Sequence, residues 1–68
     1  MMRISYNKLW KMLIDKNMKK SDLKEKAGIS SASLAKLGKG DNITTGVLLL
    51  ICEVMDCRIE DILETIKE

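Results

Sequence analysis

The sequence lacks proline, histidine and phenylalanine, and it contains only four glycines and two cysteines in 68 residues. So few helix breakers favour long helices joined by tight turns. Without histidine, a phosphate-binding loop or evident paired carboxylates, the sequence shows no catalytic constellation. We therefore predict a protein that is not an enzyme, with no cofactor, no metal and no evident small-molecule ligand.

Long apolar stretches are also missing. The longest run, residues 47–52, falls far short of the roughly 18 residues that a membrane span requires, and the first residues do not resemble a signal peptide. We expect a cytoplasmic protein without membrane contact. Cys52 and Cys57 do not have the spacing of a zinc pattern, and we expect both to be small buried side chains, with a redox role as the alternative.

The charge is distributed unevenly along the chain. Residues 1–39 contain ten basic and three acidic residues, a net charge of +7, whereas residues 40–68 contain two basic and seven acidic residues, a net charge of −5. A positive half joined to a negative half indicates one surface that faces a polyanion. The alternative is that these lysines merely solvate helix faces.

Apolar residues recur at helical spacing through most of the chain. This periodicity predicts five helices, at about residues 6–16, 18–28, 31–39, 45–55 and 59–66, and only the first few residues, through Ile4, could add a short strand. Ser30 is a good N-cap for the third helix, and Thr44 or Thr45 for the fourth. We therefore predict an all-α fold of five helices in a single domain over residues 1–68.

Residues 20–39 form the most informative segment. Gly28 supplies the glycine that a tight turn between two helices needs, and Leu23, Ile29, Leu34 and Leu37 are spaced to close a core beneath them. This arrangement leaves an outer face on the second of the two helices. That face contains Ser31, Ala32, Ala35, Lys36 and Lys39.

Two stretches resemble the Cro and phage-repressor (Xre-type) helix-turn-helix family, in its short single-domain bacterial members. MKKSDLKEKAGISSASLAKLGKG is similar to the two motif helices, and ITTGVLLLICEVMDCRIEDIL is similar to the fourth and fifth helices. The resemblance covers nearly the whole chain. It implies a five-helix lambda-repressor-like fold and a sequence-specific transcriptional regulator, a repressor that binds double-stranded DNA at a palindromic operator as a homodimer. Such a protein would be nucleoid-associated when bound to DNA.

The resemblance also implies a role for individual residues. Ser31 and Ala32 match positions that face base edges in the major groove, with Ser33 and Lys36 beside them. Lys19 and Lys20 match positions that hold phosphate at the start of the second helix. Lys39 and Asn42 match a loop that grips the DNA backbone.

The chain departs from the family pattern in three places. Lys24 stands where a small residue is usual, and it could loosen the packing of the two motif helices. Lys19 and Lys20 replace the usual Ser or Thr cap and Gln, so Ser21 is an alternative cap. The recognition helix has no Arg, Asn or Gln, the side chains that read guanine and adenine bidentately, so direct readout is weak.

Two further questions concern aromatic residues and partners. We expect Tyr6 and Trp10 to complete the core, with stacking on bases or an interface position as the alternative.

We expect the homodimer to form through the fifth helix and the end of the fourth, using Met55, Ile59, Ile62, Leu63 and Ile66. The alternative function is an antitoxin-like or other protein-binding module with the same fold.

Overall fold

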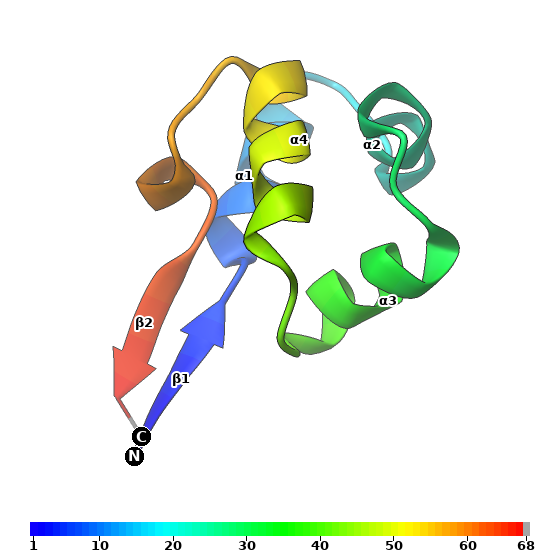
Figure 1. Ribbon diagram of the computed structural model, residues 1–68. Coiled ribbons are helices and arrows are strands. Elements are labelled where there is room, and N and C mark those ends of the chain that lie inside the picture. Colours follow the sequence, from blue (N-terminus) through cyan, green and yellow to red (C-terminus); the bar gives the residue numbers. More distant parts are fainter. Residues whose placement is uncertain (68) are drawn as a thin grey trace.

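The fold is mostly helical and includes one small sheet (Figure 1). The computed structural model describes residues 1–67, and none of the helices in that range is long and apolar enough to cross a membrane. In chain order the elements are β1 (Met2–Ser5), α1 (Asn7–Asp15), α2 (Lys20–Ala27), α3 (Ser31–Lys39), α4 (Thr45–Met55), the 3-10 helix η1 (Ile59–Asp61) and β2 (Glu64–Lys67).

The first four helices lie where the periodicity predicted them. Of the two candidate caps for α4, the structure uses Thr44, whose Oγ1 accepts a hydrogen bond from the Val47 N–H at 3.3 Å. At the other end Asp56 adopts a left-handed conformation with φ 52°, and the Cys57 N–H donates to the Cys52 carbonyl at 3.1 Å. These bonds satisfy backbone groups that a helix end otherwise leaves unpaired.

The predicted fifth helix is wrong. Residues 59–61 form a single 3-10 turn, and the chain then extends into β2 instead of continuing as a helix. β2 pairs antiparallel with β1, with Met2 opposite Lys67 and Ser5 opposite Glu64. The pairing provides hydrogen-bond partners for the backbone N–H and C=O groups of both strands. A helix over residues 59–66 would leave those of β1 without such partners. The fold is therefore four α-helices with a two-stranded sheet in the described part of the chain, and not an all-α fold of five helices.

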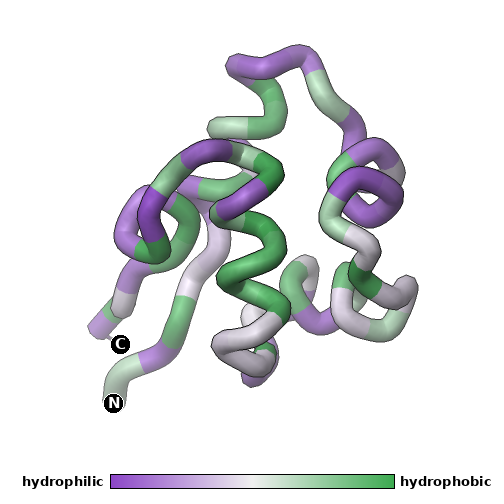
Figure 2. The backbone as a smooth tube through the Cα atoms, turned by 45° about the horizontal axis from the view of Figure 1, so that its top comes forward, coloured by the Kyte–Doolittle hydropathy of each residue, from purple (hydrophilic) through white to green (hydrophobic). Residues whose placement is uncertain are grey.

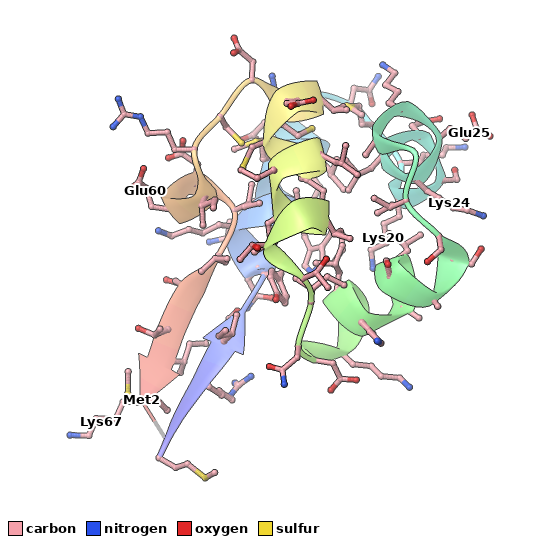
Figure 3. All side chains as sticks on the ribbon, viewed as in Figure 1. Met2, Lys20, Lys24, Glu25, Glu60 and Lys67 are labelled. Carbon is pink, nitrogen blue, oxygen red and sulfur yellow. The ribbon has the colours of Figure 1, made fainter. Side chains whose placement is uncertain are left out.

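The sheet holds the two ends of the described chain together. Met2 and Lys67 lie side by side at its far end, away from the helices (Figures 1 and 3). Ser5, at the helix-proximal end of β1, is buried, and its Oγ accepts a hydrogen bond from the Asn7 N–H at 3.3 Å. β1 thus leads directly into α1 and fixes the position of the first helix.

A single apolar core joins the four α-helices and Ile62, the residue directly after η1. Figure 2 shows α4 as the most continuously apolar helix, and it crosses the middle of the molecule. The side chains with almost no exposed surface come from each of the four α-helices and from the residue after η1: Leu9 of α1, Leu23 of α2, Leu37 of α3, Ile51 of α4, and Ile62. The core therefore fixes α2 and α3 against α1 and α4.

Candidate nucleic-acid interface

The start of α2 is capped in an unexpected way. Lys19 is the N-cap residue, and its backbone N–H donates a hydrogen bond to the Oδ2 of Asp22 at 3.0 Å. A carboxylate in the first turn also suits the positive end of the helix dipole. Ser21 therefore is not the cap, and both Lys19 and Lys20 are exposed at the helix start, where their position favours contact with an anion.

The ammonium group of Lys20 lies over an aromatic ring. Its Nζ is 4.4 Å from the centroid of the Trp10 ring, a cation–π contact between α2 and α1. Trp10 is half-buried, whereas Tyr6 is buried, so the expectation that both complete the core holds fully only for Tyr6. Figure 3 shows Lys20 between the helices and Lys24 directed outward from α2. Lys24 is half-buried, so its stem covers the helix while its charge stays in water.

Gly28 makes the turn between α2 and α3. It has φ 69°, a left-handed conformation that glycine adopts without the steric penalty of a Cβ. Ser30 then caps α3, because its Oγ accepts from the Ser33 N–H at 3.1 Å and its hydroxyl donates to the Ser33 Oγ at 3.1 Å. The Ser33 side chain is thus half-buried and engaged in the cap, which leaves it less available to a ligand than its neighbours.

α3 presents a continuous exposed face. Leu37 is buried and fixes which side of the helix faces the core. The residues on the outer side are exposed: Ser31, Ala32, Ala35, Lys36 and Lys39. The first turn of this face contains small side chains, and its second half contains the two lysines. A helix of this width with small residues at its N-terminal end fits a DNA major groove.

A hollow lies beside α3, at the start of α4. Its lining includes Ser33 and Lys36 from α3, Asn42 and Ile43 from the connecting loop, and Thr44 and Val47 at the α4 start. Three of the residues predicted from sequence therefore come together here. Lys39 does not join them, and it lines a second hollow between β1 and the end of α3.

The Cro/C1-type HTH DNA-binding domain family matches residues 8–68. The chain belongs to this family. The crystal structure of the transcriptional regulator VanUg (form II) is similar to this chain at 54% sequence identity and a TM-score of 0.94, over 98% of this chain and 89% of that one. No curated protein matches the chain. In this family α2 and α3 are the helix-turn-helix, so the exposed face of α3 belongs to a DNA-binding domain.

The two cysteines of this helix-turn-helix protein contact each other at the end of α4. Cys52 is buried and Cys57 half-buried, and the Cys57 N–H donates a hydrogen bond to the Cys52 carbonyl at 3.1 Å. Burial, and then the neighbouring Cys52, raise the pKa of Cys57 to about 11. A protonated thiol is a poor nucleophile. The expectation of a small buried side chain holds fully only for Cys52. In residues 1–67 no cluster of His, Cys, Asp or Glu could hold a metal ion.

Sequence reasoning missed two features of this interface. The Trp10 contact with Lys20 was not foreseen, although an aromatic residue on α1 and a lysine at the start of α2 are both visible in the sequence. Thr44 was expected only as a cap, yet it also lines the hollow beside α3. Both features depend on how α1 and α4 pack around the motif, which local sequence patterns do not encode.

Proposed function

We propose that this protein is a sequence-specific DNA-binding regulator, a repressor that inserts α3 into the major groove of a palindromic operator. The observation that supports this proposal best is the exposed face of α3, with small side chains in its first turn and lysines behind them. The core beneath holds this face rigidly, because Leu23 of α2 and Leu37 of α3 have almost no exposed surface. We further propose that the chain acts as one domain in the cytoplasm, without catalytic activity.

The proposed contacts divide into reading and holding. Ser31 and Ala32 reach base edges, whereas Lys19 and Lys20 hold phosphates at the start of α2. Lys36 and Asn42 contact phosphate as well, and their common position in the hollow at the start of α4 supports this assignment. Ser33 lines the same hollow and also takes part in the cap of α3. Lys39 holds the backbone from the end of α3.

Selection of bound sequences from a random DNA pool tests the reading role. We expect the wild-type protein to enrich a symmetric site. Ala32→Gln should change the preferred base at one position per half-site, because Gln pairs bidentately with adenine and a good bidentate pair contributes about 1–3 kcal/mol of discrimination. Ala35→Gln serves as a matched control one turn further along the same exposed face, and its effect should fall on a different base or on none.

If no sequence is enriched, and substitutions on the α3 face change neither affinity nor preference, α3 does not enter the groove. The protein-binding function, with an antitoxin-like role, would then replace the regulator. An exposed apolar surface on α4, at Leu49 and Leu50, would suit such a protein partner.

The proposed homodimer needs a surface that differs in part from the one expected from sequence, and Ile59 belongs to both. Met55 and Ile62 lie in the core, with 2% and 0% of their surface exposed, so they cannot bind a second copy. Leu49 and Leu50 on the outer side of α4, together with Ile59 of η1, are large exposed apolar side chains. We propose that these three residues form the dimer contact and that it places two α3 helices about 34 Å apart, one DNA turn.

Leu50→Glu should prevent dimerisation. Wild-type protein should sediment at twice the 7.7 kDa mass of the chain at micromolar concentration, while the variant should sediment as a monomer because a buried unpaired charge opposes association. Ile14→Glu is the matched control, since Ile14 is also an exposed apolar residue but lies on α1. A wild-type protein that remains monomeric with and without operator DNA would rule out the homodimer.

A further inference from the structure

A second hollow lies between the N-terminal strand and the end of the recognition helix. It has a volume of about 90 Å³, and its lining includes Arg3, Ser5, Asn7, Trp10, Gly38 and Lys39. Two of these side chains are cationic, three others can donate hydrogen bonds, and none of the residues that the structure places around the hollow is acidic. A concave surface with this composition favours an anion with several oxygen atoms.

The walls of this hollow are held close together. Gly40, with φ 72°, approaches β1 so closely that a Cβ there would lie 3.2 Å from the Ile4 carbonyl oxygen. The Tyr6 hydroxyl, at the start of α1, donates a hydrogen bond to the Asp41 carbonyl at 3.4 Å. The pairing of β1 with β2 fixes the strand that carries Arg3. The hollow is therefore formed before any ligand arrives.

The hollow also adjoins the proposed DNA-binding face. Lys39, one of its lining residues, lies on the exposed face of α3. Trp10 also lines the hollow, and the Lys20 ammonium lies over its ring. This contact places the hollow next to the start of α2. A DNA strand that lies along α3 between Lys20 and Lys39 would therefore pass the opening.

We propose that this hollow binds a phosphate group and that, in the complex with DNA, it holds one backbone phosphodiester in each half-site. The guanidinium of Arg3 and the ammonium of Lys39 supply the charge, and Arg3 offers the planar fork that matches phosphate oxygens. Gly38 leaves room, since a Cβ at this position would meet no atom within 4 Å. This proposal rests on the proposed function and adds the N-terminal strand to the DNA contacts.

The open space at Gly38 allows a test that leaves the fold intact. Gly38→Gln and Gly38→Glu introduce side chains of equal size without a backbone clash, and both replace a glycine within a helix. We expect Gly38→Glu to bind operator DNA about tenfold more weakly than Gly38→Gln, because only Glu places a negative charge at a phosphate site. Equal melting temperatures would confirm that the difference arises in binding.

A second pair of variants removes one positive charge from each strand of the sheet. Arg3→Gln removes a proposed phosphate contact, whereas Lys67→Gln removes a charge from the far end of β2 (Figure 3). Arg3→Gln should weaken DNA binding about tenfold and make the slope of log K against log salt shallower by about one per protomer. Lys67→Gln should leave the slope unchanged.

Inorganic phosphate, titrated at constant ionic strength, separates the two sources of this ligand. If the Gly38 amide and Trp10 indole NMR signals shift when phosphate is added in the absence of DNA, the hollow binds free phosphate as well as DNA. If these signals shift with DNA but not with inorganic phosphate, the hollow is a phosphodiester site. This proposal is wrong if the wild type binds DNA but the paired variants do not differ: Arg3→Gln binds DNA as tightly as Lys67→Gln, and Gly38→Glu as tightly as Gly38→Gln. The proposed function then stands. If the wild type binds no DNA, the proposed function is wrong, and the phosphate titration alone decides whether the hollow is an anion site.

Discussion

Ile51→Ala is expected to lower the free energy of unfolding by about 2–5 kcal/mol. Ile51 has no exposed surface and lies in the middle of α4, the apolar helix that crosses the molecule (Figure 2). The change removes buried carbon atoms and leaves a cavity that neighbouring helices fill only in part. A domain of this size is marginally stable, so such a loss would remove a large share of its total stability.

Urea unfolding followed by circular dichroism measures this effect, with protein concentration held fixed because dimerisation would also contribute. Ile14→Ala is the matched control, because it is the same chemical change at a residue that is 76% exposed. The control should change stability by less than about 0.5 kcal/mol. Similar losses for both variants would mean that α4 does not face the core as described.

The sequence allowed the helical part of the fold to be predicted because its information is local. Apolar spacing predicted α1 to α4, and the chemistry of single residues predicted where helices begin and end, as at Ser30 and Gly28. The same reasoning failed for residues 59–66. Ile59, Ile62 and Ile66 have helical spacing, yet the last of them lies in β2.

The physical reason is the distance along the chain between the paired strands. Arg3 pairs with Ile66, more than sixty residues away, and no local pattern reveals that pairing. A strand of four residues is also too short to show clear alternation. Ile62 lies in the core with no exposed surface, whereas the sequence analysis placed it in the dimer contact, so neither the backbone nor the burial of this residue was predicted.

The candidate site divides in a similar way. Exposure of Lys19, Lys20, Lys36 and Lys39 followed from helix periodicity and from the family resemblance. The two hollows beside α3 could not be predicted, because each joins residues from segments that only the tertiary fold brings together. The sequence analysis included Ile59 in the dimer contact but also Met55 and Ile62, which lie in the core.

DNA binding should depend steeply on salt. Lys20, Lys36 and Lys39, with Lys19, offer three or four phosphate contacts per protomer, so a dimer would neutralise about six to eight phosphates and give a slope of log K against log salt of about −5 to −7. Raising the salt from about 50 mM to about 200 mM should then weaken binding at least about a thousandfold. These lysines are exposed, so counterion release and not burial governs their contribution.

Lys39→Ala should weaken binding to all sequences alike and make this slope shallower by about two, one for each protomer. Lys67→Ala is the control, because Lys67 lies at the far end of the sheet, away from α3 (Figure 3). Salt titrations on the selected operator and on random DNA distinguish holding from reading. A change of base preference would show that Lys39 reads a base edge, and a slope equal to that of Lys67→Ala would show that the end of α3 lies away from the DNA backbone. Because a phosphate contact carries no sequence information, the expected loss is the same on both DNAs, and that equality is what identifies Lys39 as a residue that holds the backbone.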